Sequence, residues 1–154
     1  MIVYRLCKKG YANDLSGRGA EINGGRWNGK GLAALYTSSS RALCAIEIMV
    51  HVPAGIIPKD YVMVVIDVPD NDPVKTIDVK DLPSNWNSNP IAVSTQRIGN
   101  TFLYEQKSLV LKVPSAIIKD DWNYIINPVH KGFQRIKILS TETFAFDTRL
   151  FKTV

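Results

Sequence analysis

The chain has few of the residues that build disulfide frameworks and metal sites. Among its 154 residues there are two cysteines, Cys7 and Cys44, and two histidines, His51 and His130. The cysteines lie far apart and without metal-type spacing, so we expect ordinary reduced thiols. Two Cys and two His in unrelated contexts form no ligand cluster, and we predict that the protein binds no metal.

Long hydrophobic runs are also missing. No apolar segment approaches the roughly 18 to 20 residues that a membrane-spanning helix needs. The first five residues lack the basic segment followed by a long apolar one that marks a signal peptide, so we expect a cytoplasmic protein without a membrane partner. With 45% hydrophobic and 21% charged residues, the composition is ordinary for a globular protein. The length predicts a single domain that spans residues 1–154.

The basic residues are not gathered into a block, although the net charge is +5 and the isoelectric point is near 9.2. Scattered charge suits an anionic small substrate or an acidic protein partner as well as nucleic acid. No helix-turn-helix pattern or alternation of basic and aromatic residues is visible in the sequence. A basic RNA-binding module stays open as an alternative.

Hydrophobic periodicity predicts a mixed domain of about six or seven strands and one clear helix, without a βαβ alternation. The strands are expected at residues 2–6, 32–37, 61–68, 74–79 (an edge strand), 109–113, 135–139 and 143–146. The clear helix is expected within 38–52, a weaker one at 90–104, and a helical turn within 115–122. Residues 8–31 hold seven of the ten glycines. We expect a long loop there, and such loops are more often functional than idle.

One carboxylate interrupts the apolar stretch 42–50. Glu47 is its only charged residue, in a helix that opens with cap-type serines and ends before Pro53. An unpaired buried carboxylate is costly, so Glu47 needs a partner or a function. His51 lies four residues further on, on the same helical face, so both titratable groups could face one site. The pattern also fits a helix with one solvated stripe.

Three other stretches carry unusual residue types. Residues 24–29 read Gly-Gly-Arg-Trp-Asn-Gly, where glycines allow close backbone approach and the planar fork of Arg26 suits phosphate; an ordinary turn is the alternative. Tyr36 ends a predicted strand and fits either a flat ligand or core packing. Ser115 follows a strand and a proline, which is typical of a turn or cap rather than a nucleophile. We expect His130 to be structural.

In chain order the pattern is Gly-Gly-Arg-Trp-Asn, Tyr-Thr-Ser, Ala-Ile-Glu-Ile-Met-Val-His, Val-Pro-Ser-Ala and Asn-Tyr-Ile-Ile-Asn-Pro-Val-His. This pattern resembles the RES domain family. The arginine, glutamate and serine that give the family its name fall on Arg26, Glu47 and Ser115. The resemblance covers nearly the whole chain, from Tyr4-Arg5 to residues 146–150.

The resemblance implies a fold like that of the diphtheria-toxin-like ADP-ribosyltransferases, a single compact α+β domain with a mixed, mainly antiparallel β core. It implies a toxin of a bacterial toxin-antitoxin pair, partnered by an antitoxin with an Xre-type helix-turn-helix domain. We expect DNA contact to belong to that antitoxin. The resemblance also implies that NAD is consumed as a substrate, with no other cofactor.

NAD chemistry suits the three residues that name the family. Cleavage of the nicotinamide glycosidic bond builds positive charge on the ribose while neutral nicotinamide leaves, so a carboxylate beside the ribose is what the transition state needs. Glu47 is expected to stabilise this cation, and Arg26 to clamp a phosphate. Ser115 is expected to hydrogen-bond either the ribose or the Glu47 carboxylate.

Four further residues are expected at the substrate. Tyr36 would lie against the nicotinamide or its ribose. His51 would orient the carboxylate or contact the substrate, while Trp27 and Asn28 would shape the pocket. Core packing of Trp27 is an equal alternative.

The acceptor decides the name of the reaction. Attack by water would make an NAD glycohydrolase, attack by inorganic phosphate an NAD phosphorylase, and attack by a protein side chain an ADP-ribosyltransferase. We favour NAD degradation, with ADP-ribosylation of a target protein as the alternative and a non-catalytic binding module as the alternative of another class.

Overall fold

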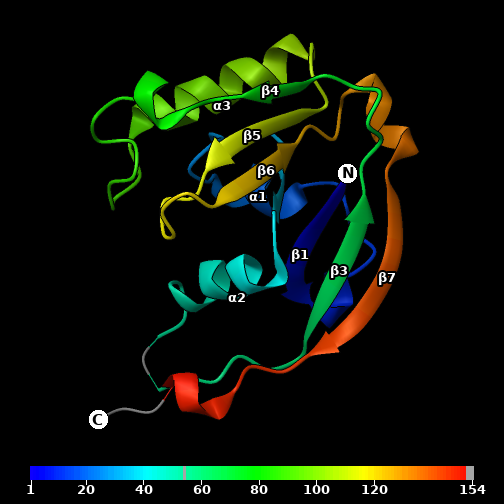
Figure 1. The fold of residues 1–154 in the computed structure, drawn as a ribbon, viewed down its shortest axis with the longest axis vertical. Helices are drawn as coiled ribbons and strands as arrows, with labels where there is room; N and C mark the ends of the chain where they lie inside the picture. The colour runs from blue at the N-terminus through cyan, green and yellow to red at the C-terminus, as the bar shows by residue number, and fades with distance from the viewer. Residues whose placement is uncertain (54, 152–154) are drawn as a thin grey trace.

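The computed structural model describes residues 1–53 and 55–151. Within these ranges seven strands form one sheet in the order β4-β5-β6-β2-β1-β3-β7 (Figure 1). The strands are β1 (Ile2–Lys8), β2 (Leu35–Ser38), β3 (Tyr61–Asp67), β4 (Val74–Thr76), β5 (Val110–Pro114), β6 (Trp122–Ile126) and β7 (Lys137–Phe144). Only β4 and β5 run parallel among the described pairs. The predicted α+β class with a mainly antiparallel core is confirmed.

Three α-helices lie within the described residues. They are α1 (Arg18–Asn23), α2 (Arg41–Met49) and α3 (Val93–Glu105), accompanied by the short 3-10 turns η1 (Lys9–Tyr11), η2 (Val79–Asp81), η3 (Lys131–Arg135) and η4 (Thr148–Phe151). Ser40 caps α2, because its hydroxyl accepts a hydrogen bond from the Leu43 amide at 3.1 Å. None of these helices is long and apolar enough to cross a membrane.

The apolar run in β3 is explained by burial on both of its faces. Val64 and Ile66 belong to a core cluster with Val3 and Leu109, whereas Met63 points to a separate cluster with Phe146. A strand covered on both sides needs no polar alternation. A third cluster packs α3 against β5 and β6 through Phe102, Leu111 and Ile125, and it includes Trp27.

The sheet divides between β1 and β2. Seven Cα pairs join β1 to β3, from Ile2↔Asp67 to Lys8↔Tyr61, whereas a single pair, Tyr4↔Ser38, joins β1 to β2. The two halves of the sheet therefore separate on either side of this pair, and Figure 1 shows β5 and β6 lying apart from β1, β3 and β7. This divergence provides the opening in which the candidate site lies.

Several predicted elements differ from the structure. Residues 135–139 and 143–146 were expected to form two strands, but one strand, β7, pairs with β3 along its length with a bulge at Val65/Ile66. The middle of β7 is polar because this edge strand is exposed, and in the sequence such a polar stretch looks like a turn between two strands. The expected helical turn within 115–122 is replaced by bends and a turn. The strand β6 was not predicted, because its first three residues are only partly buried.

The glycine-rich segment 8–31 is not a continuous loop, since it contains η1 and α1. Gly17 precedes α1 and Gly24 follows it, with φ angles of 72° and 73°. Those left-handed conformations are open to glycine at little cost. The other predicted strands and both predicted helices are present with shifted ends.

Gly99 allows α3 to pack directly on the backbone of Trp27. A Cβ atom at Gly99 would lie 1.7 Å from the Trp27 carbonyl oxygen. We predict that Gly99→Ala lowers the free energy of unfolding by about 2 to 3 kcal/mol, because backbone cannot move aside cheaply. Denaturant unfolding measures this. Gly10→Ala is the matched control, since a Cβ atom at Gly10 would have no described neighbour within 4 Å. Equal midpoints for the two variants would contradict the packing argument.

Candidate functional site

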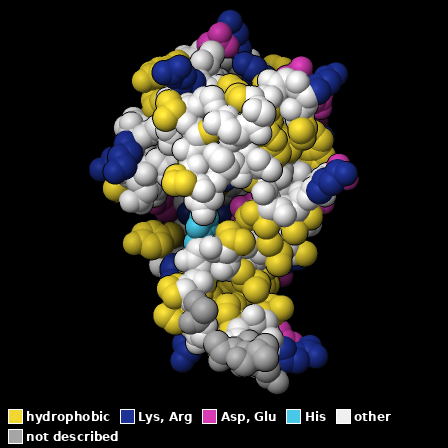
Figure 2. All heavy atoms as spheres, turned by 90° about the vertical axis from the view of Figure 1, so that its left-hand side faces the viewer, with side chains coloured by type: hydrophobic (Ala, Val, Ile, Leu, Met, Phe, Trp, Pro, Cys, Tyr) yellow, Lys and Arg dark blue, Asp and Glu magenta, His cyan; other side chains and the backbone are white. Residues whose placement is uncertain are grey.

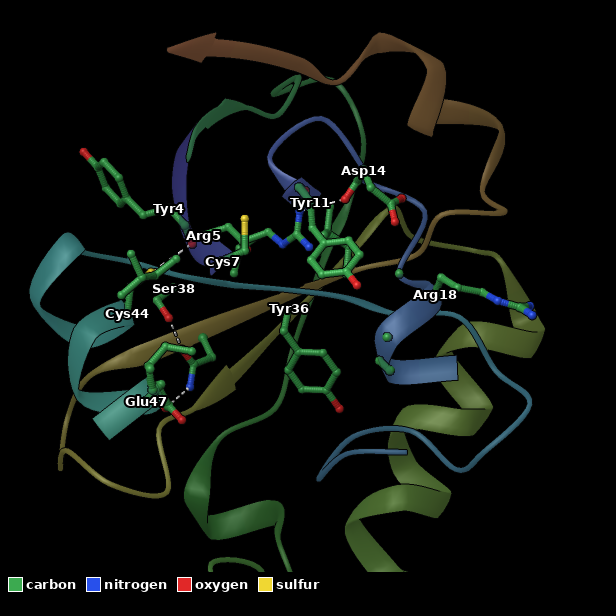
Figure 3. Close-up of a pocket in the computed structure, with 18 of the residues that line it drawn as sticks. Tyr4, Arg5, Cys7, Tyr11, Asp14, Arg18, Tyr36, Ser38, Cys44 and Glu47 are labelled. Carbon is green, nitrogen blue, oxygen red and sulfur yellow. Dashed lines mark hydrogen bonds between the residues drawn. The ribbon is translucent and has the colours of Figure 1, made fainter. Parts of the chain in front are cut away.

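A cavity of about 580 Å³ opens where β1 and β2 diverge. This volume is within the range of roughly 300 to 1,000 Å³ that is usual for small-molecule sites. Strands β1 and β2, helices α1 and α2, the segment after β1 and one residue of β6 supply the lining (Figure 3). Its polar and titratable members are Tyr4, Arg5, Cys7, Tyr11, Asp14, Arg18, Asn23, Tyr36, Thr37, Ser38, Cys44, Glu47 and Asn123.

Glu47 projects from α2 into this cavity, and one of its carboxylate oxygens is held by the protein. Oε1 accepts a hydrogen bond from Asn123 Nδ2 at 2.6 Å and another from Ser115 Oγ at 3.2 Å. Among the described residues no group donates to the other oxygen, Oε2. The carboxylate is therefore aimed by two neutral donors and keeps one oxygen available to a ligand.

Asn123 is in turn held by Ser38. The Ser38 hydroxyl donates to Asn123 Oδ1 at 2.7 Å, and the two residues are partners in the β2–β6 ladder. With its carbonyl oxygen occupied in this way, the amide turns its NH2 group toward Glu47. Neither residue was predicted as part of the site. In the sequence, Asn123 could have been singled out as the polar residue inside the otherwise aromatic and aliphatic run Trp-Asn-Tyr-Ile-Ile.

Ser115 is 5% exposed and its hydroxyl is fully engaged. Besides donating to Glu47, Oγ accepts from the amides of Ile117 and Ile118, both at 3.1 Å. One proton and two lone pairs are all that a hydroxyl offers. The structure thus shows the second of the two predicted bonds, the one to the carboxylate, and Ser115 has the turn geometry expected of a non-nucleophilic serine.

Arg26 lies near Glu47 but outside the cavity lining. Its Nη1 donates to the backbone carbonyls of Trp86 at 2.7 Å and Ser88 at 3.1 Å. Burial lowers the pKa of the Arg26 guanidinium, and the nearby negative charge of Glu47 opposes that shift. Nε and Nη2 of Arg26 donate to no group among the described residues, and its contact with a phosphate stays a prediction.

Tyr36 lines the cavity as predicted, and its hydroxyl is fixed from behind. It accepts from the Trp27 amide at 2.9 Å and donates to Asn28 Oδ1 at 2.8 Å. Burial raises the pKa of Tyr36 well above its ordinary value, so the phenol remains a donor at neutral pH. The ring therefore presents a fixed wall to the cavity.

Trp27 and Asn28, predicted to shape the pocket with core packing as an equal alternative for Trp27, hold the Tyr36 hydroxyl and are not among the residues that line the cavity. Trp27 is 2% exposed within the α3 core cluster, and Asn28 is 0% exposed. The Asn28 amide donates to the carbonyls of Ala20 at 2.8 Å and Leu32 at 2.9 Å. Both residues lie behind the cavity, because the buried ring and the amide are used to fold the glycine-rich segment.

His51 is likewise not brought to the cavity. Helix α2 ends at Met49, and the His51 amide bonds the Ile48 carbonyl in a following turn, with the residue exposed. His51 therefore lies just beyond the end of α2, and its role at the substrate stays a prediction. His130 is structural, as expected: it is 4% exposed, and its Nδ1 accepts from the Gly132 amide at 3.0 Å.

Both cysteines line the cavity as thiols. Burial raises the pKa of Cys7, and it raises the pKa of Cys44 to about 11. The Cys44 thiol donates to the Tyr4 carbonyl at 3.1 Å. Such thiols are poor nucleophiles at neutral pH. In residues 1–53 and 55–151, no three His, Cys, Asp or Glu side chains come together as a metal site would need.

Known proteins resemble this chain over nearly its full length. A family model described as the RES domain matches residues 2–147. A protein named Toxin Res from Yersinia enterocolitica is 37% identical over 152 residues, which are 97% of this chain and 99% of that protein. A protein named Prs ADP-ribosylating toxin from Sphingobium sp. is 36% identical over 144 residues, or 92% of this chain and 89% of that protein.

A solved structure has the same fold. One chain of the crystal structure of the M. tuberculosis MbcT-MbcA toxin-antitoxin complex matches with a TM-score of 0.71 and 18% sequence identity, covering 97% of this chain and 86% of that chain. At this level of identity the likeness concerns the fold alone. The family model and the relatives, in contrast, match by sequence over nearly the full length. The chain belongs to the RES domain family.

Proposed function

We propose that this protein is a toxin of a bacterial toxin-antitoxin pair that depletes NAD by cleaving the bond between nicotinamide and ribose. The observation that carries the proposal is the Glu47 carboxylate, which faces a cavity with one oxygen held by Asn123 and Ser115 and the other free of described donors. Relatives named as toxins, one of them as an ADP-ribosylating toxin, support the assignment.

The carboxylate suits a dissociative cleavage. As the bond between the ribose C1′ and the nicotinamide nitrogen breaks, its electron pair leaves with nicotinamide, which departs neutral, and the ribose becomes cationic. Glu47 then supplies the negative charge beside the cation, and its free Oε2 can accept hydrogen bonds from the ribose hydroxyls. No general acid is needed, so one carboxylate is sufficient.

The residues around Glu47 act by positioning it. Asn123 and Ser115 hold Oε1 in one place, which removes the need to reorganise the carboxylate during the reaction. Arg26 contributes a nearby positive charge from behind. In this proposal Tyr36 forms the wall against the nicotinamide riboside, and the phosphate contact of Arg26 stays a prediction, since its Nε and Nη2 donate to no described residue.

The acceptor defines three versions of the proposal. Water gives an NAD glycohydrolase and inorganic phosphate gives an NAD phosphorylase, which we favour together as NAD degradation. A protein side chain as acceptor gives an ADP-ribosyltransferase, and the name of the Sphingobium relative favours this second candidate. In each case the acceptor bonds to the ribose C1′ and loses its proton to solvent.

An RNA-binding module has less support. On the face that Figure 2 shows, lysine and arginine side chains are spread around the outline and form no continuous patch. For partners we propose an antitoxin, since the related fold occurs in a toxin-antitoxin complex. An Xre-type antitoxin, the absence of direct DNA contact by this chain and a cytoplasmic location remain part of the proposal.

Glu47→Gln tests the proposal directly. The change keeps the size of the side chain and removes the charge, so we expect the rate of NAD loss to fall by about 100-fold or more while the fold persists. The purified protein is incubated with NAD, with and without phosphate and a cell extract, and the products are resolved by mass. The products also identify the acceptor.

The matched control is Glu142→Gln. Glu142 lies on the exposed strand β7, where it pairs with Arg41, and it is not part of the cavity lining. We expect wild-type NAD loss from that variant. If the wild-type protein neither consumes NAD nor modifies a protein, the enzymatic proposal is wrong. Wild-type activity in Glu47→Gln would remove Glu47 from the mechanism.

The Ser38–Asn123 hydrogen bond gives a second prediction. Ser38→Ala frees the Asn123 amide to rotate, so we expect kcat for NAD loss to fall about tenfold, the equivalent of roughly 1.4 kcal/mol, with little change in KM. Ser38→Thr keeps a hydroxyl and is expected to restore kcat. Thr95→Val serves as the control, since it removes a buried hydroxyl on α3 that bonds the Ala92 carbonyl. An equally impaired Ser38→Thr variant would contradict the positioning role.

A further inference from the structure

The cavity extends well beyond Glu47, and its two ends differ in chemistry. Figure 3 shows Glu47, Ser38 and Cys44 at one end and Tyr11, Asp14 and Arg18 at the other, with Arg5 and Tyr36 between them. The proposed cleavage uses only the Glu47 end. A substrate that consisted of nicotinamide riboside alone would leave the Tyr11 end of the cavity unused.

Tyr11 presents an aromatic ring to this second end. Its side chain lines the cavity, yet the residue is 61% exposed, and in the described residues no hydrogen bond uses its hydroxyl. Ile22, on the same short helix as Arg18, is a second lining residue with an apolar side chain, and it is 56% exposed. A ring and an aliphatic side chain left uncovered at a cavity wall suit the face of a flat heterocyclic base.

Arg5 supports the Tyr11 end and supplies a positive charge between the two ends. Its Nη1 donates to the carbonyls of Tyr11 at 3.1 Å and Asp14 at 2.7 Å, which holds this segment beside β1. Among the described residues, Nε and Nη2 of Arg5 have no hydrogen-bond partner. A guanidinium with two nitrogens to spare is well suited to phosphate oxygens.

The order of these groups matches a dinucleotide. NAD consists of nicotinamide riboside, a diphosphate and adenosine, and the cavity offers in sequence a carboxylate, a guanidinium and an exposed aromatic ring. We infer that the Tyr11 end is a subsite for the adenosine half of NAD, in which the Tyr11 ring stacks on the base and Arg5 faces the diphosphate. This inference rests on the proposed function, which sets the nicotinamide at Glu47.

The test compares NAD with nicotinamide mononucleotide, which has the scissile bond and lacks the adenosine half. Tyr11→Ala is expected to lower kcat/KM for NAD about tenfold, because stacking of the base is lost, and to leave kcat/KM for the mononucleotide unchanged. Tyr11→Phe keeps the ring and is expected to behave as the wild type. Tyr104→Ala is the control, since Tyr104 is 71% exposed on α3 and is not in the lining.

The outcomes separate this inference from the proposed function. If Tyr11→Ala lowers kcat/KM equally for both substrates, or leaves kcat/KM for NAD unchanged, the adenosine subsite is refuted. If the wild-type protein cleaves neither substrate, the proposed function fails, and calorimetry with ADP decides the subsite independently. The subsite then predicts that ADP binds the wild type and Tyr11→Phe about tenfold more tightly than Tyr11→Ala. A wild-type protein that does not bind ADP would refute it.

Discussion

A single ladder pair, Tyr4↔Ser38, holds the two halves of the sheet together between β1 and β2. Because these strands pair at one position only, they diverge and leave room for the cavity between β1, β2, α1 and α2. Full pairing along both strands would close the sheet and remove the site. Ser38 is thus both the residue at which the halves meet and the residue whose hydroxyl holds Asn123.

The polar groups around Glu47 are arranged so that each is satisfied. Ser115 distributes its hydroxyl among two backbone amides and the carboxylate, and Asn123 divides its amide between Ser38 and Glu47. In a low-dielectric interior an unsatisfied member would be costly, whereas a complete network fixes one geometry. The same network leaves a single carboxylate oxygen open to the cavity. The hydrogen bonds that stabilise the site therefore also decide which oxygen a ligand can reach.

The sequence contained enough information for features that depend on neighbouring residues. Apolar β-branched runs located β3 and β5, and a lone charge in an apolar helix located Glu47. Features that depend on where an element ends, or on what it meets in space, were missed. The end of α2 at Met49, two residues before His51, is one such feature, because helical periodicity does not show where a helix stops. Asn123 and Arg5 reach the site only through strand pairing; the polar residue in the run Trp-Asn-Tyr-Ile-Ile marks Asn123 as unusual, but no local pattern shows which residue it meets.

The bonds that hold Glu47 join residues separated by 68 and 76 positions, and the Ser38–Asn123 bond spans 85. Contacts of such long range form only after the intervening chain has been ordered. On the ribosome, Glu47 is made well before Ser115 and β6, so the carboxylate remains unsupported during most of synthesis. A nascent or prematurely terminated chain would carry Glu47 without its hydrogen-bonded geometry, and the proposed activity would therefore appear only once the protein is nearly complete.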